Sequence, residues 1–256
     1  MLKKFKMRIK SRGLKCTLFA VWDRITLRYY FRLRKQRAEF NKIYLLSGNK
    51  QRFEAIYDKK LWGDHGSLSG AGSSLNSTAE FRKWLIKNVP KLGISKIVDA
   101  PCGDFWWMQH VVKRLNVEYH GIDIVPSLIK NNIKQHSASN ITFSTSNICY
   151  DSIPDSDLLI IRDCLFHFSF EDICKVFKNL EAVEYKYLIT TNYIVNDNFI
   201  NNDILTGDFR VISLFNHPFN FDETSVYERI HEITENGFHR ELCIFKKEVV
   251  PTELQF

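Results

Sequence analysis

Short apolar segments alternate with helical patterns from residue 94 to residue 191, and this alternation strongly limits the folds open to the chain. Brief runs rich in Ile, Val and Leu predict buried strands, and longer stretches with apolar residues every three or four positions predict helices. A strand, helix, strand order requires parallel neighbours joined by right-handed crossovers. We therefore expect an α/β fold with a mostly parallel sheet. The predicted strands are 94–99, 118–123, 141–144, 158–161 and 187–191, and the predicted helices are 105–115, 126–136 and 171–180.

The last part of the chain follows a different pattern. Strand-like segments at residues 226–233 and 238–246 flank Thr234-Glu235-Asn236-Gly237. Asn-Gly between two strand-like segments is a strong hairpin signal, because both residues tolerate the positive φ angles of a tight turn. The sequence therefore predicts that an antiparallel hairpin closes the parallel sheet.

Polar residues and a glycine follow the predicted strands at the points where the strands end. In an open parallel sheet, ligands bind at the carboxyl ends of the strands. The first strand ends at Asp99 and leads to Gly103, which lets a ligand approach the backbone closely. The second strand ends at Asp123, and an acid at this place is suited to accept both hydroxyls of a ribose. The third strand leads to Asn147, whose amide can read the edge of an adenine.

Several stretches of sequence together resemble one known family. They are Leu61-Trp62-Gly63, Ser69-Gly70-Ala71-Gly72-Ser73, VDAPCGDFWWM, GIDIV and DLLIIRDCLFHFS. With them the chain resembles, over about residues 52–250, the class I S-adenosylmethionine (SAM)-dependent methyltransferases, in particular bacterial members associated with polysaccharide and sugar modification. The resemblance implies a Rossmann-like sheet of seven strands and SAM as the cofactor.

The resemblance also implies a set of cofactor-binding residues. They are Asp99, Gly103 and Asp104 around the methionine part, Asp123 at the ribose, Asn147 and Ile148 at the adenine, Asp163 beside the sulfonium and the transferred methyl group, and Ile124. Of the family's usual GxGxG turn only the middle glycine is present, as Gly103, and Asn147 stands where an acid is usual. The complete GxGxxG fingerprint is absent, which argues against a dehydrogenase.

The end of the fourth predicted strand is the candidate catalytic centre. Methyl transfer to a hydroxyl requires an aligned acceptor and a base that takes its proton. His167 is the candidate base, four residues after Asp163; the alternatives for His167 are a packing residue among phenylalanines and a hydrogen-bonding partner of the substrate. Asp163 is a second candidate catalytic residue, because an acid at the end of an apolar strand is costly unless partnered. Arg162 is predicted either to pair with an internal acid or to bind an anionic acceptor.

Two further segments are candidates for substrate binding. Residues 61–75 crowd Gly and Ser around Trp62 and His65, and they predict either a lid that excludes water or a plain linker. Residues 193–223 form a long stretch rich in Asn, Asp and Phe that contains Arg210. Long insertions are usually functional, so this stretch is predicted either to bind a sugar or aromatic acceptor or to pack as a crossover.

Charge divides the chain into a basic arm and a mildly acidic body. Residues 1–42 hold fourteen Lys or Arg against two acids, a net charge of +12, which leaves −5 for the remainder. Apolar residues at spacings of three and four between Leu14 and Tyr29 predict an amphipathic helix. Such an arm suits an anionic membrane surface or lipid-linked substrate, a nucleic acid, or a surface of its own domain. The predicted division is a basic arm over 1–45, a segment covering the cofactor site over 46–92 and a methyltransferase domain over 93–256.

The remaining features set the expected location and function. The six cysteines lack metal-ligand spacing, which predicts a reducing compartment and no metal site. No run approaches the ~18 apolar residues of a membrane span, so we expect a cytoplasmic protein, with peripheral contact at the inner membrane surface as an option. The predicted function is O-methylation of a sugar or polysaccharide precursor, with a small molecule or glycan as the acceptor. The alternatives are a nucleic-acid methyltransferase that uses the arm and a non-catalytic scaffold of the same fold.

Overall fold

A computed structural model describes residues 36–63, 66–233 and 239–254. The chain divides into two compact units, residues 1–45 and residues 46–256. In the first unit residues 36–44 are helical, and the rings of Phe40 and Tyr44 lie one turn apart with centroids 6.1 Å from each other. The predicted amphipathic helix between Leu14 and Tyr29 lies outside the described residues.

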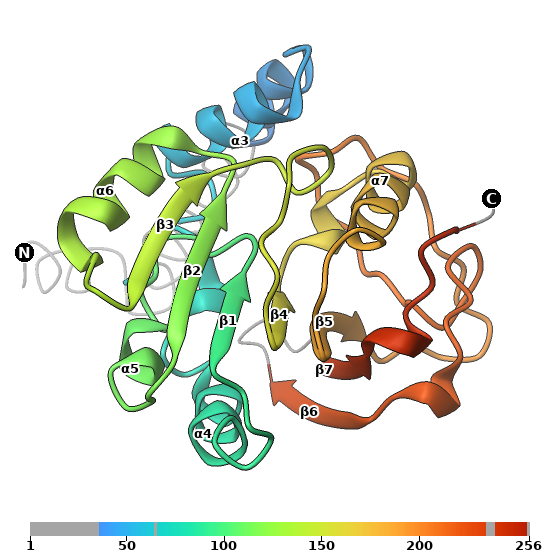
Figure 1. Cartoon of the computed structure of the whole chain (residues 1–256). Helices are drawn as coiled ribbons and strands as arrows, with labels where there is room; N and C mark the ends of the chain where they lie inside the picture. Colours follow the sequence, from blue (N-terminus) through green and yellow to red (C-terminus); the bar gives the residue numbers. More distant parts are fainter. Residues whose placement is uncertain (1–35, 64–65, 234–238, 255–256) are drawn as a thin grey trace, which may run out of the picture. The chain divides into compact units, whose positions relative to one another are not determined.

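The described part of the second unit contains one sheet of seven strands in the order β3-β2-β1-β4-β5-β7-β6 (Figure 1). Neighbours among β1 to β5 are parallel, whereas β7 runs antiparallel to both β5 and β6. The predicted Rossmann-like, mostly parallel sheet with a closing antiparallel hairpin is confirmed; the hairpin turn lies outside the described residues. The strands are β1 (Lys96–Asp99), β2 (Glu118–Asp123), β3 (Ile141–Thr145), β4 (Leu158–Ile161), β5 (Tyr187–Tyr193), β6 (Glu228–Ile233) and β7 (His239–Lys246).

The helices begin where the sequence provides suitable first residues. Pro126 opens α6, where its missing N–H leaves no bond unmade. The Ser169 hydroxyl accepts the Asp172 N–H at 3.2 Å and caps α7. The α-helices are α3 (Asn49–Asp58), α4 (Ala79–Asn88), α5 (Gln109–Val112), α6 (Pro126–His136) and α7 (Phe170–Leu180), and the 3₁₀ turns are η1 (Ala71–Ser73), η2 (Leu165–His167), η3 (Glu223–Ser225) and η4 (Lys247–Val249).

The core lies on both faces of the central strands. All four residues of β4 are buried, which explains its unbroken apolar sequence, since a strand covered on both faces has no polar side. α4 contributes the fully buried Phe81 and Leu85, and α7 contributes Ile173 and Phe177. Burying each of these large side chains contributes about 1.5–3 kcal/mol to folding, so the strand ends are held on a rigid support.

The predicted helix over 105–115 is wrong in extent. Only Gln109–Val112 are helical, because Phe105 adopts a positive φ of 56° and turns follow it up to α5. Its ring packs against Tyr119 and Phe143, with centroid distances of 5.0 and 5.1 Å. Phe105 therefore packs its ring against the sheet instead of beginning a long helix.

Residues 194–222, which connect β5 to η3, have no regular secondary structure apart from turns. Side-chain amides order this segment: Asn192 Oδ1 accepts the Leu214 N–H at 2.8 Å, and Asn201 exchanges hydrogen bonds of 2.9 Å with both backbone groups of Ser213. The high Asn content of the segment is thus partly explained by internal bonding.

Candidate functional site

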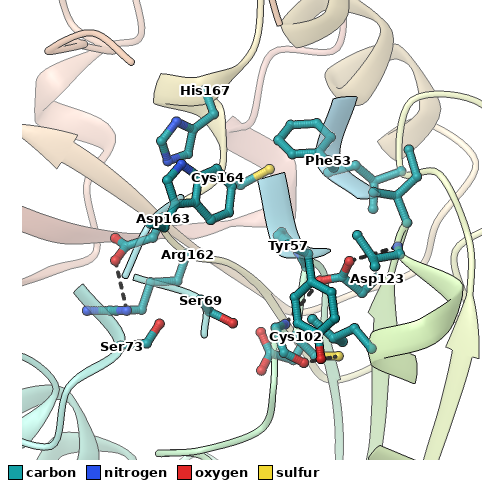
Figure 2. Close-up of a pocket in the computed structure, with 18 of the residues that line it drawn as sticks. Phe53, Tyr57, Ser69, Ser73, Cys102, Asp123, Arg162, Asp163, Cys164 and His167 are labelled. Atoms are coloured by element: carbon teal, nitrogen blue, oxygen red, sulfur yellow. Dashed lines mark hydrogen bonds and ion pairs between the residues drawn. The ribbon is translucent and has the colours of Figure 1, made fainter. Parts of the chain in front are cut away.

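A pocket lies at the carboxyl ends of β1, β2 and β4 and beside the residues that follow β3 (Figure 2). Its empty volume is about 1020 Å³, open solvent at the mouth included. This size is in the range of cofactor and small-molecule sites. The predicted site residues that line it are Trp62, Asp99, Gly103, Asp123, Ile124, Asn147, Ile148, Arg162, Asp163 and His167.

Asp123 organises the turn that follows β1. Its Oδ2 accepts the Gly103 N–H at 3.2 Å, and its Oδ1 accepts the Val125 N–H at 3.0 Å. Gly103 has a positive φ of 55°, and a side chain there would run into Ser69, so only glycine fits without strain. Burial raises the pKa of Asp123 to about 6, and the backbone N–H groups oppose this rise.

Asp99 is the second buried acid at this end of the sheet, with an exposed fraction of 2%. The Tyr119 hydroxyl donates a hydrogen bond of 2.8 Å to Asp99 Oδ2. Burial raises the pKa of Asp99 to about 7, although Tyr119 and the positive charge of Arg162 act in the opposite direction. Asp99 and Asp123 therefore both change charge close to neutral pH.

Apolar residues form much of the wall near β2 and β3. Ile124, Leu128 and Ile148 line the pocket, the last two buried. Asn147 lies beside them, and its Oδ1 accepts the Cys149 N–H at 3.0 Å. This bond fixes the amide while leaving the Nδ2 group and one lone pair of Oδ1 for a ligand.

Helix α3 contributes lining residues that the sequence patterns do not indicate. Asn49, Phe53 and Tyr57 all line the pocket, and Figure 2 shows the last two. The Phe53 ring packs with its centroid 5.8 Å from that of Phe168, which follows η2. The Gly/Ser stretch adds Trp62 and, among others, Ser69 and Ser73. Two segments far from the strand ends in sequence thus complete the pocket.

His167 is held in a defined orientation. Its Nδ1 lies 2.7 Å from the carbonyl oxygen of Asp208; since a carbonyl only accepts, Nδ1 carries the proton and Nε2 the lone pair. Trp62 stacks on the imidazole, with ring centroids 4.7 Å apart and planes inclined by 22°. Burial lowers the pKa of His167 to about 4, so the ring is neutral at pH 7. None of the residues that the structure describes hydrogen bonds to Nε2, which remains able to accept a proton.

Arg162 and Asp163, which follow β4, belong to a buried cluster of four charged side chains, here called the charge cluster, with Glu232 of β6 and Arg240 of β7. Arg162 lies 3.0 Å from Asp163 Oδ2 and 3.0 Å from Glu232 Oε2. Arg240 also lies 3.0 Å from an oxygen of each acid. Arg162 Nη2 donates to the Gly72 carbonyl oxygen at 2.9 Å as well. Arg162 therefore pairs with internal acids, one of its two predicted roles.

The cluster determines the charge of Asp163. Burial alone would raise the pKa of Asp163, but the guanidinium groups of Arg162 and Arg240 outweigh burial and hold this pKa below its usual value. The Asp163 backbone has a positive φ of 54°, and its N–H donates to Thr191 Oγ1 at 2.9 Å. Asp163 thus presents an ionised carboxylate in a fixed position.

Comparison with solved structures identifies the fold, whereas no protein-family model and no curated protein sequence matches the chain. One similar structure is Burkholderia thailandensis 1,6-didemethyltoxoflavin-N1-methyltransferase with bound 1,6-didemethyltoxoflavin and S-adenosylhomocysteine (SAH); the TM-score is 0.54 at 11% identity, over 79% of this chain and 91% of the other. Human N-acetylserotonin methyltransferase in complex with SAM has a TM-score of 0.53 at 10% identity, over 76% of this chain and 59% of the other. The chain has the class I methyltransferase fold.

A third structure with this methyltransferase fold is PigF with SAH, which has a TM-score of 0.51 at 12% identity. The match covers 81% of this chain and 62% of PigF. This chain therefore spans only about three fifths of the length of the human enzyme and of PigF. The names of these three proteins refer to no sugar or polysaccharide acceptor, so the part of the resemblance that these structures support is the fold.

Two predicted site residues lie elsewhere in this methyltransferase fold, and a third is not among the described residues. Asp104 does not line the pocket, because its carboxylate accepts the Ser67 hydroxyl at 2.9 Å and the Leu68 N–H at 2.7 Å and so holds the Gly/Ser stretch. Arg210 does not line it either; its guanidinium is buried, donates to the Phe168 carbonyl oxygen and lies 5.1 Å from the centre of a phenylalanine ring. His65 lies outside the described residues.

Gly72→Ala is expected to lower the melting temperature by about 3 to 10 °C, because overpacking typically costs about 1–3 kcal/mol. A Cβ at Gly72 would collide with the Asp163 carboxylate and lie 3.2 Å from Arg240 Nη1. Thermal unfolding followed by circular dichroism measures the change. Gly48→Ala is the matched control, since its Cβ would meet only the flexible Gln51 side chain. Equal melting temperatures for both variants would contradict this account.

Among the described residues, no group of three or more His, Cys, Asp or Glu side chains is arranged to hold a metal ion. Nor does any helix in the same part of the chain have both the length and the apolar character to cross a membrane.

Proposed function

We propose that the chain is a SAM-dependent methyltransferase that transfers the methyl group to a hydroxyl. The observation that carries the proposal is the convergence on one pocket of Asp123, Asn147 and Asp163, which lie at or just after the ends of three different strands. The likeness in fold to methyltransferases whose structures contain SAM or SAH supports it.

The residues present fit SAM. The apolar residues Ile124 and Ile148 suit an adenine, and Asn147 retains groups that can hydrogen bond to its edge. Asp123 accepts two backbone N–H groups and retains lone pairs for ribose hydroxyls. SAM carries positive charges on its sulfonium and amino groups, and Asp99 and Asp163 provide the opposite charge.

SAM, when bound, supplies an electrophilic methyl group, and the residues of the chain supply orientation and proton transfer. His167 Nε2 would take the proton of the acceptor hydroxyl, because Nδ1 is committed to Asp208. The stacked Trp62 ring keeps the imidazole in place and excludes water from one of its faces. Asp163 would hold negative charge beside the reacting centre while its two arginine partners keep it ionised.

The second part of the proposal concerns the acceptor of the methyl group. We infer a sugar or polysaccharide precursor, free or lipid-linked, on the basis of the sequence resemblance. The basic arm of residues 1–45 would bring the enzyme to an anionic membrane surface or to such a precursor in the cytoplasm. Residues 46–92 would act as the cover of the site, since Phe53, Trp62 and Ser69 all line it.

Calorimetric titration with SAM and with SAH tests the proposal, followed by incubation with labelled SAM and a panel of nucleotide sugars, glycans and RNA. We expect micromolar binding of both ligands and label transfer to a carbohydrate. Label on RNA, with a steep loss of affinity as salt rises, would favour a nucleic-acid methyltransferase instead. Absence of SAM and SAH binding would leave a non-catalytic scaffold.

SAM affinity is expected to fall as the pH drops from 7.5 to 5.5. Burial raises the pKa of Asp99 to about 7 and that of Asp123 to about 6, so both acids take up protons in this range. A positively charged ligand favours the ionised acids, so binding lowers both pKa values and releases protons below pH 7. Calorimetry in buffers of different ionisation enthalpy measures affinity and proton release together. A constant affinity over this range, or proton uptake, would contradict the expectation.

A further inference from the structure

The charge cluster has a front and a back relative to the pocket. The Asp163 side chain is 16% exposed, whereas the side chains of Arg162 and Arg240 are 3% exposed and that of Glu232 is fully buried. Asp163 and Arg162 line the pocket, and Glu232 and Arg240 do not. A bound ligand therefore meets the carboxylate first, while the other acid and the second guanidinium lie behind it.

The two rear members come from the terminal hairpin. Glu232 and Arg240 are directly opposite each other across β6 and β7, and each also contacts a residue that follows β4. Two arginines and two acids make the cluster neutral overall. Replacing one buried partner leaves a net charge in surroundings of low dielectric, where it acts over a longer range than in water.

Resting on the proposed function, we propose that Glu232 and Arg240 are positioning residues that set how strongly the pocket prefers a sulfonium to a neutral thioether. They hold the Asp163 carboxylate in place, and together they balance the charge behind it. The sulfur atom is positively charged in SAM and neutral in SAH, so the electrostatic potential at that atom separates substrate from product. A preference for the sulfonium favours release of the product after methyl transfer.

The test compares the affinities of SAM and SAH by calorimetry at pH 8 in the full-length protein. Glu232→Gln removes one negative charge and keeps an oxygen for Arg162, whose Nη2 donates to both Glu232 oxygens at 3.1 and 3.0 Å. The SAM preference, which is the ratio of the SAH to the SAM dissociation constant, is expected to fall by about three- to tenfold, as a unit charge acts through an effective dielectric of about 20. In Arg240→Met the ratio should stay at or above the wild-type value, because a positive charge is lost. The double variant should lie between the two single variants.

Arg229 and Glu241 provide a matched control on the same hairpin. Arg229 Nη1 lies 2.6 Å from Glu241 Oε1, and Glu241 directly follows Arg240, so its side chain points to the opposite face of the strand. Arg229→Met and Glu241→Gln should leave the SAM preference unchanged even where they lower the melting temperature.

The outcomes separate this inference from the proposed function. A wild-type protein that binds neither SAM nor SAH refutes both. Binding by the wild type, with equal losses for SAM and SAH in Glu232→Gln, refutes only the inference, since damage to the fold affects both ligands alike. A change in the same direction in Glu232→Gln and Arg240→Met also refutes it.

Discussion

His167→Ala is expected to lower kcat by about 10²-fold or more while SAM affinity stays within about threefold of wild type, because a positioned base typically contributes 10²- to 10⁴-fold. The imidazole is neutral and has a free Nε2, and its Nδ1 is tied to the Asp208 carbonyl oxygen. Removing it leaves the acceptor hydroxyl without a group that takes its proton. Transfer of labelled methyl to the acceptor found in the panel measures kcat, and calorimetry measures SAM binding.

His167→Asn separates proton transfer from the hydrogen bond to Asp208. The Asn amide can donate to the Asp208 carbonyl oxygen as Nδ1 does, but it has no basic nitrogen. We therefore expect Asn to be as slow as Ala. If Asn restores the rate, the hydrogen bond to the Asp208 carbonyl oxygen is sufficient and the assignment of His167 as the base is refuted.

The pH profile at saturating SAM provides a second check on His167. Burial lowers its pKa to about 4, so the neutral base is fully present above pH 5 and is lost as the pH falls through 4. We expect kcat to be flat between pH 5 and pH 8. A midpoint near 6.5, the value of an exposed histidine, would show that the proton is taken by a group in another environment.

The strand-end residues were predictable because a parallel sheet brings the carboxyl ends of its strands to one edge. Asp99, Asp123 and Asp163 each interrupt or end an apolar segment. Burying an acid in such a place costs free energy unless it has a partner or a ligand, so these residues indicate a site. Local sequence was sufficient there, since the topology follows from the alternation of strands and helices. Asp104 shows where this reasoning stops: it is one residue from Gly103, yet its carboxylate turns to the Gly/Ser stretch.

The rest of the site depends on contacts between segments that are distant in sequence, and local sequence patterns do not predict such contacts. Phe53 and Tyr57 lie on a helix whose apolar residues are compatible with many partners, and only tertiary packing brings them to the pocket. The charge cluster likewise forms only through contacts between strands that are distant in sequence. The cluster depends on the register that places Glu232 opposite Arg240, and a shift of one strand by one residue would put the two side chains on opposite faces of the hairpin.

Asp123→Ala is expected to weaken SAM binding by about 1–3 kcal/mol, or about 5- to 150-fold, because a charged acceptor of two ribose hydroxyls is lost. The carboxylate also accepts the N–H groups of Gly103 and Val125, so the turn after β1 loses two of its bonds at the same time. Calorimetry at pH 8, where Asp123 is ionised, measures the loss.

Asp157 is the control that distinguishes ligand binding from damage to the turn. Its Oδ2 accepts the N–H groups of Ser95 and Lys96 at 2.7 and 3.1 Å. These residues are at the start of β1, so Asp157 lies at the amino ends of the strands, opposite the pocket. Asp157→Ala therefore removes comparable backbone bonds and should lower the melting temperature while SAM affinity stays within about twofold of wild type. Equal weakening in both variants would mean that Asp123 acts through the fold alone, and wild-type affinity in Asp123→Ala would remove it from the binding site.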